Sequence, residues 1–335
     1  MTTSNANTGA GSGRTAGATR AWAAPLGAHG ATLRLACILA GVVLIGTLAS
    51  GGILLRPSNL LDVVQQESIL LVLVTAQFFV IATGGIDLSV GAVIALSSVV
   101  FVSALDAGPV FACFAALLSG CVFGLVNGLL VTFVRLPAFV VTLGTMQIGY
   151  SVAKLWSHGG TVDTSAGGRH IPHAMLDFYS EKLAGLPLAF WAALAVLGLG
   201  SLYLRTATGS FTFAIGGNRR AARLAGIPVE QVSLAAYATG STIAAAAGLL
   251  FAMRVGYGDP HTGVWLPLDS IAAISVGGVS LTGGQGNLVA GFIGVLILAL
   301  VDNTMNLVGI SALVQPAVKG VILLLAVLAY SRKTT

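Results

Sequence analysis

Long apolar segments separated by short polar gaps constrain this chain more than any other feature of its sequence. Of its 335 residues, 56% are hydrophobic and only 8% are charged, whereas soluble domains carry roughly 25% charged residues. A water-soluble core of this length would come with a far more charged surface. Because a helix satisfies its own backbone polar groups in lipid, each apolar segment is expected to be helical. The sequence therefore predicts an all-α, polytopic membrane protein.

A window of about 20 residues, the length of helix that crosses a bilayer, predicts ten spans. They cover residues 34–55, 64–83, 87–106, 109–134, 137–157, 187–204, 232–253, 268–283, 286–308 and 312–331. The eighth span is short and rich in glycine, and a re-entrant or broken segment is the alternative there. An even number of spans places both termini on the same side of the membrane.

The distribution of Lys and Arg predicts the orientation of these spans. With a cytoplasmic amino terminus, the inner segments hold Arg14, Arg20, Arg34, Arg135, Arg205, Arg219, Arg220, Arg223, Arg332 and Lys333. The outer segments hold only Arg56, Arg169, Lys182 and Arg254. Cytoplasmic loops carry an excess of basic residues, so both termini are predicted to be cytoplasmic. The net charge of +5 is explained by topology and does not indicate nucleic-acid binding.

The chain is expected to divide into a tail and one membrane domain. Residues 1–32 are rich in Ala, Gly, Ser and Thr, and with few large apolar side chains they are expected to be disordered in the cytoplasm. Residues 33–333 form the membrane domain, with a polar loop at 158–186 outside and a polar segment at 206–231 inside. The first apolar run is long and has no convincing cleavage site, which favours a retained helix over a signal peptide.

The segment 206–231 is too polar to cross a bilayer and long enough to fold. Asn218 is suited to cap a helix after the turn-forming pair Gly216 and Gly217. Residues 219–225 are good helix formers, and Gly226 followed by a proline is a typical stop. The sequence therefore predicts a short helix in the middle of this cytoplasmic segment.

The composition of that short helix suits it for docking. Small alanines such as Ala222 can enter a groove, while Arg219, Arg220 and Arg223 can pair with carboxylates on the rim. Basic residues are common in cytoplasmic loops, so anchoring of the topology is an equally good interpretation of their position alone.

A second motif, GGIDLSVG, begins at Gly84. Gly84 and Gly85 permit a sharp turn, and Asp87 can accept backbone N–H groups at the start of the following helix, with Ser89 nearby. A carboxylate at a membrane-embedded helix end is costly unless it is satisfied in this way or faces water. Asp87 is therefore interpreted either as a structural helix cap or as part of a cytoplasmic gate.

Several polar residues inside the predicted spans are expected to face the bundle interior or a cavity. Asn127, Asn303 and Asn306 are the candidates for a translocation path, and hydrogen bonding between helices is the alternative for each. A faint similarity between the two halves of the chain, in which Asp87 corresponds to Asp269, predicts a two-fold internal repeat typical of transporters.

The sequence excludes catalytic chemistry of several kinds. None of the four lysines follows a Gly-rich phosphate-binding loop, so this chain cannot hydrolyse ATP by that route. The five histidines lie in the tail or in outer loops, and their spacing predicts no metal site. A paired nucleophile and base is equally hard to assemble. We expect no enzyme activity, no metal and no cofactor.

Long stretches of the chain resemble ribose-type permeases of ATP-binding-cassette importers. They are FAIGGNRRAARLAGIPVEQV (213–232), TGGIDLSVGAVIALSSVV (83–100), LPAFVVTLGTMQIGYSVAKLWSHGGTV (136–162) and nearly all of 268–328. The resemblance covers residues 35–333 in consistent order and spacing. The long amino-terminal tail and the polar stretch 158–186 depart from the family pattern.

This resemblance implies a permease of the bacterial inner membrane that works as a homodimer or a related heterodimer. Its implied partners are a cytoplasmic ATPase subunit and a periplasmic binding protein that delivers a monosaccharide, such as ribose. The resemblance makes 206–231 the segment that couples to the ATPase. The residues it assigns to this coupling are Gly216, Gly217, Asn218, Arg219, Arg220, Ala222, Arg223 and Gly226.

Two other classes of function are alternatives to the importer. A self-contained, proton-coupled secondary transporter could use Asp87, Asp302 or Lys319, but it leaves the structured basic segment unexplained. An intramembrane enzyme would need the nucleophile and base that the sequence does not pair.

Overall fold

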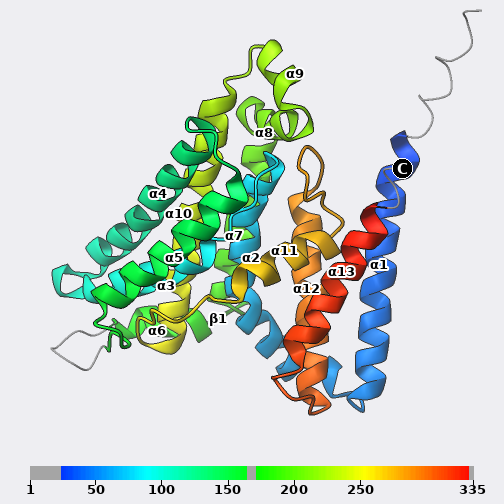
Figure 1. The fold of residues 1–335 in the computed structure, drawn as a ribbon. Helices are drawn as coiled ribbons and strands as arrows, with labels where there is room; N and C mark the ends of the chain where they lie inside the picture. Colours follow the sequence, from blue (N-terminus) through cyan, green and yellow to red (C-terminus); the bar gives the residue numbers. More distant parts are fainter. Residues whose placement is uncertain (1–23, 164–170, 332–335) are drawn as a thin grey trace, which may run out of the picture.

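Helices account for most of the structure, a computed structural model that describes residues 24–163 and 171–331 (Figure 1). The first half contains α1 (Ala24–Ala49), η1 (Ile53–Leu55), α2 (Pro57–Ala82), α3 (Val90–Ser103), η2 (Leu105–Ala107), α4 (Pro109–Thr132) and α5 (Ala138–Trp156). The second contains α6 (His173–Ser180), α7 (Leu188–Leu204), α8 (Ala207–Gly217), α9 (Arg219–Leu224), α10 (Val229–Val255), α11 (Leu266–Val276), α12 (Leu288–Leu307) and α13 (Gln315–Ser331). Two-residue strands β1 (Lys182–Leu183) and β2 (Leu186–Pro187) pair antiparallel.

Each of the ten apolar segments predicted from the sequence overlaps one α-helix. Within the described ranges, α2, α4, α10 and α12 are long and apolar enough to cross a membrane, and α7 with α8 forms a fifth candidate bent by 78°. Shorter apolar helices such as α3, with 14 residues, extend only about 21 Å at 1.5 Å per residue. The molecule is therefore a helical, multi-pass membrane protein.

Several boundaries differ from the sequence-based expectation. Helix α1 begins at Ala24 and α2 at Pro57, ahead of the predicted starts at 34 and 64. Of the predicted tail 1–32, residues 1–23 lie outside the described part of the chain. The eighth segment ends at Val276 instead of residue 283, because Gly278 takes a positive φ of 78° that turns the chain.

Helix α2 is the centre of the bundle. Every residue from Ser68 to Ala82 is buried, and α2 packs against α7, α10, α11 and α12. A helix that is apolar around most of its circumference can be surrounded by other helices, and this position places α2 among four of them.

Helix α4 is buried on one side only. Its buried stripe consists of small residues four apart, including Gly120, Gly124 and Gly128, whereas Val110 and Phe114 are well exposed. A Cβ at Gly120 would lie 2.5 Å from the Cβ of Ala245 in α10, so the helices touch along their backbones. This confirms the close-packing surface predicted from the glycine spacing. The exposed large side chains suit contact with lipid.

The segments α8–α9 and α6–β2 lie at opposite ends of the bundle (Figure 1). Between α10 and α11 the chain runs back along α3. Gly258 and Val162 exchange backbone hydrogen bonds of 2.8 and 3.1 Å, and Ser98 Oγ accepts from the Asp259 N–H at 3.2 Å. This returning segment leads into α11, which contacts both α2 and α3.

Candidate functional site

Helix α9 is a short, capped helix at one end of the molecule (Figure 1). The Asn218 side chain accepts from the backbone N–H of Ala221 at 2.9 Å, as expected of an N-cap. Gly226 follows the helix with a φ of 80°, a conformation that favours glycine. Both the predicted start and the predicted stop of this helix are confirmed.

The contacts of α9 revise one part of the docking prediction. Ala222 is buried in a cluster with Ile215, Val229 and Val232 of the same chain, so it fixes α9 to α10 and does not face a partner groove. The side chain of Arg223 forms an ion pair with Glu230, which ties α9 to α10 a second time. A small alanine is suited both to entering a partner groove and to packing within the chain. The apolar side chains around Ala222 show that it packs within the chain.

The free surface of α9 combines cations with one apolar side chain. Arg219 and Arg220 are exposed, and Leu224 is 84% exposed at the end of the helix. Arginine is enriched in protein contact surfaces, and the exposed Leu224 next to Arg223 adds apolar area to this face. Sequence reasoning missed Leu224, because a leucine in a short helix is more often buried.

The predicted docking segment and the GGIDLSVG motif meet at a contact that we call the glycine junction. It consists of Gly84, Gly216, Gly217, Gly283 and Gly284. The Gly284 N–H donates to the Ala82 carbonyl oxygen at 3.2 Å. A Cβ at Gly283 would lie 2.6 Å from the Cα of Gly84, closer than real Cβ atoms approach. The end of α8, the α2–α3 turn and the α11–α12 loop thus touch through backbone atoms.

Asp87 lies next to this junction, in a buried hydrogen-bond network. Its Oδ1 accepts from the backbone N–H of Ser89 at 2.8 Å and from the Ser89 hydroxyl at 2.5 Å. Asn127 Nδ2 donates to Ser89 Oγ at 2.8 Å, and the Thr145 hydroxyl donates to Asn127 Oδ1 at 2.7 Å. The network joins the start of α3 to α4 and α5.

The predicted cap at Asp87 takes a different form from an N-cap. The N-cap position of α3 belongs to Ser89, and Asp87 sits two residues earlier, where its carboxylate closes a turn on the Ser89 N–H. Because Asp87 and Ser89 are both fully buried, this turn satisfies the Ser89 N–H and hydroxyl where water cannot reach them, while Asp87 Oδ2 has no hydrogen-bond partner among the described residues.

The structure does not bring the three candidate path residues together. Asn127 is fully buried in the Asp87 network. Asn303 exchanges two hydrogen bonds with Asn59, at 2.8 and 3.0 Å, which join α12 to α2. Asn306 accepts from the Gln315 side chain at 2.7 Å. Each amide therefore binds a different neighbour, as in the alternative of hydrogen bonding between helices.

A cavity of about 450 Å³ opens beside the glycine junction. Its lining includes Gly84 and Gly85 of the motif together with Arg219 and Arg223 of α9. The side chain of Tyr237, from α10, completes the wall between them. The residues predicted from two separate motifs thus share one surface.

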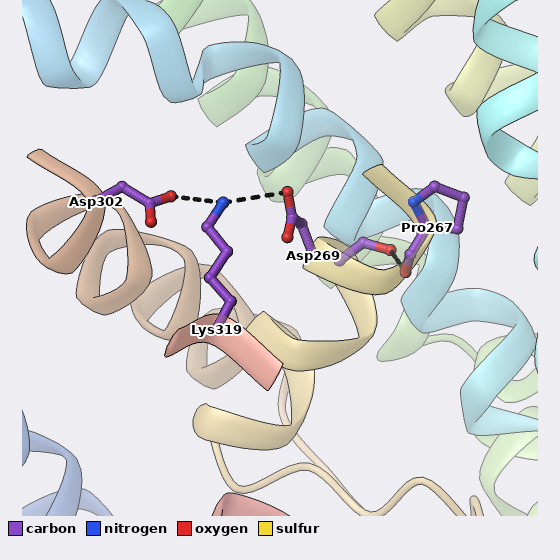
Figure 2. A network of polar contacts seen from close by, with 5 residues as sticks. Pro267, Asp269, Asp302 and Lys319 are labelled. Atoms are coloured by element: carbon purple, nitrogen blue, oxygen red, sulfur yellow. Dashed lines mark hydrogen bonds and ion pairs between the residues drawn. The ribbon is translucent and has the colours of Figure 1, made fainter. Parts of the chain in front are cut away.

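A second cavity, of about 520 Å³, lies among α2, α10, α11, α12 and α13. Lys319 Nζ lies between Asp302 Oδ2, at 2.8 Å, and Asp269 Oδ2, at 3.3 Å (Figure 2). On the first turn of α11 the Ser270 hydroxyl donates to the Pro267 carbonyl oxygen at 2.8 Å. Charged side chains from three helices thus meet in the interior. Sequence reasoning singled out Asp302 and Lys319 but could not pair them with Asp269.

Comparison with known proteins places these features in a family. The chain is 36% identical over 283 residues to the ribose import permease protein of Bacillus subtilis (strain 168), covering 84% of this chain and 87% of that protein. It is 35% identical over 280 residues to the ribose import permease protein of Escherichia coli (strain K12), covering 82% and 86%. The L-arabinose ABC transporter permease protein of Azospirillum brasilense is 32% identical over 277 residues, covering 82% and 80%. No solved structure is significantly similar.

The family match itself spans residues 59–327, from the first turn of α2 into α13. It contains the GGIDLSVG motif, α9 and the charged cavity. Its members and the relatives above are transport components, so the function is transport and not catalysis. The chain belongs to the family described as Branched-chain amino acid transport system / permease component.

Proposed function

We propose that this protein is the membrane-spanning subunit of an ATP-binding-cassette importer that carries a monosaccharide, ribose or a related sugar. A separate cytoplasmic ATPase subunit drives transport, and a periplasmic binding protein delivers the sugar. The observation that carries this proposal is α9, a capped helix with an exposed Leu224, whose Arg219 and Arg223 share a cavity with Gly84 of the glycine junction. A helix built in this way suits binding to a partner groove.

The family and the relatives differ in the substrate that their descriptions name. The family description refers to branched-chain amino acids, whereas the relatives reported above are permeases for ribose and L-arabinose. Those relatives are more than 30% identical across most of this chain. We therefore infer a sugar as the substrate class.

The proposed orientation keeps both termini and α9 in the cytoplasm and α6 outside, in the inner membrane of a bacterium. The opposite positions of α9 and α6 in the bundle support it (Figure 1). We further infer ten spans arranged as two related halves, and a functional pair of permease subunits, as in importers of this type.

Through the glycine junction, a movement caused by the proposed ATPase can reach the interior of the permease. When α9 moves, Gly216 and Gly217 press directly on Gly84 and Gly284, because no side chain separates these backbones. Packed interiors transmit displacement of this kind efficiently. Asp87 and Ser89 follow Gly84 along the chain, and their hydrogen bonds hold α3, α4 and α5 together. They would therefore pass the movement on to these three helices.

Reconstitution into liposomes tests the proposal against its alternative. We expect sugar uptake only when the ATPase subunit, ATP and the binding protein are all present. Uptake by this chain alone, driven by an imposed proton gradient, would show a self-contained secondary transporter and overturn the importer proposal.

A further inference from the structure

The cavity around Lys319 has the size and lining of a small-molecule site. Its volume of about 520 Å³ falls in the range of roughly 300–1,000 Å³ that holds small ligands. Five charged side chains line it, from α2, α10, α11, α12 and α13. They are Glu67, Arg254, Asp269, Asp302 and Lys319. Charged groups inside a membrane domain are costly, and they commonly mark a substrate pathway.

Ion pairing holds two of the carboxylates in fixed positions. Lys319 Nζ contacts one oxygen of Asp302 and one oxygen of Asp269 (Figure 2). The second oxygen of Asp302, Oδ1, is buried and has no hydrogen-bond partner among the described residues. A buried acceptor without a partner is costly, so this carboxylate is held in place chiefly by its contact with Lys319.

The lining favours a neutral, polyhydroxylated ligand. Three carboxylates face two permanent cations, so the cavity has no positive excess to attract a phosphate. The carboxylate oxygens accept from hydroxyl groups, and Lys319 and Arg254 can donate to sugar oxygens. Trp265, which also lines the cavity and is 63% exposed, offers a flat apolar face to the C–H groups of a sugar ring. Apolar side chains, among them Ile69, Leu70 and Phe251, also line the cavity, so competition by leucine is part of the test below.

A smaller cavity leads toward this one from the end of the bundle that carries α6. It measures about 300 Å³ and is lined by polar groups that include Gln65 of α2 and Tyr179 of α6. Gln66 and Arg254 line both cavities, so the two are neighbours with a shared wall. Polar side chains thus line both cavities between α6 and Lys319.

We propose that the cavity around Lys319 holds the sugar on its way through the permease. Glu67, Asp269 and Asp302 accept its hydroxyl groups, and Trp265 covers one face of its ring. Lys319 positions the two carboxylates that it bridges. This inference rests on the proposed function and adds the site and the ligand chemistry, in place of the asparagines suggested by the sequence.

Direct binding to the purified, full-length permease in detergent is the first test. Millimolar ribose, without binding protein or ATPase, is expected to change the intrinsic fluorescence of the wild-type protein. The Trp265→Phe variant is expected to lose that change. Leucine and ribose 5-phosphate serve as the competing ligands. A saturable response to leucine or to the phosphate, with none to ribose or to L-arabinose, would overturn the assignment of a neutral sugar.

Transport by variants is the second test. Glu67→Gln is expected to lower sugar uptake about tenfold, the loss that accompanies one charge-assisted hydrogen bond. Trp265→Ala is expected to lower uptake about tenfold as well, because it removes the apolar face that covers the sugar ring. Asp177→Asn, an exposed acid on α6, is the matched control and should transport normally. Binding-protein-stimulated ATP hydrolysis should persist in every variant, because the sites for both partners are intact.

The outcomes separate the two proposals. Normal uptake by both Glu67→Gln and Trp265→Ala would overturn the sugar site and leave the importer standing. Failure of the wild-type assembly to import any sugar would overturn the importer itself. Trp265 is largely exposed, so its replacement is not expected to disturb folding. Trp265→Ala therefore still tests the sugar site if Glu67→Gln fails to fold.

Discussion

At the glycine junction three segments touch through backbone atoms, whereas around Lys319 several helices meet through charged side chains that surround open space. The first contact has no side chain that could give way, so displacement of one segment displaces the others. The second region leaves room for a ligand and holds its polar groups in place by ion pairs. The comparison suggests a division of labour, with movement transmitted at one region and substrate recognised at the other.

The largest expected effect comes from adding a methyl group to the glycine junction. In Gly216→Ala the new Cβ would run into the Ala82 carbonyl and the Gly284 backbone, so we expect a cost of about 1–3 kcal/mol in stability. Thermal unfolding in detergent should shift down, and uptake in liposomes should be lost.

The adjacent glycine supplies the control. A Cβ at Gly217 would find its nearest neighbour, the Cα of Gly284, at an ordinary 3.9 Å. Gly217→Ala should therefore stay within about 0.5 kcal/mol of wild type. Equal behaviour of the two alanine variants would show that the junction is not tightly packed.

The next effect is expected at Asp87, which lies beside the junction. Asp87→Ala leaves the buried Ser89 N–H and hydroxyl without their acceptor, at a cost of about 1–3 kcal/mol. Unfolding temperature and uptake should fall together, while Asp87→Asn, which keeps an acceptor oxygen, should lose less of both. A loss of uptake by Asp87→Ala with unchanged unfolding would identify Asp87 as part of the gate instead.

The smallest effect is expected from Asn303, which lies outside both regions. Its pair of hydrogen bonds with Asn59 contributes about 0.6 kcal/mol each, the average for such contacts in membranes. Asn303→Ala should therefore transport sugar at close to the wild-type rate. A transport defect as large as that of Trp265→Ala would restore Asn303 to the translocation path.

The sequence predicted the positions of the helices far better than their contacts. Apolar length alone located each segment, and Asn218 and Gly226 marked the ends of α9, because caps act through neighbours in sequence. Helix α8 was missed within the polar segment, since it is stabilised by distant contacts such as that of Phe213 with Phe78, whose ring centroids lie 6.1 Å apart.

The candidate sites show the same limit. Asp269 and Lys319 are 50 residues apart, and no local pattern indicates that they form an ion pair. The glycine junction is formed by residues of three glycine pairs that are far apart in the sequence, at 84–85, 216–217 and 283–284. In the sequence, each pair resembles an ordinary turn. The exposure of Leu224 and the burial of Ala222 depend on how α9 lies against α10, which composition does not specify.

Co-purification of the ATPase subunit with α9 variants tests the central claim most directly. Arg223 pairs with Glu230 and holds α9 in place, so the informative change is Arg219→Glu combined with Leu224→Asp. Arg205→Glu, at the end of α7, is the control with a similar change of charge. We expect the double variant to retain less than about a tenth of the ATPase, because it removes an apolar anchor and reverses its charged neighbour. The control should retain all of it. Undiminished co-purification with the double variant would contradict the account of α9 as the docking site.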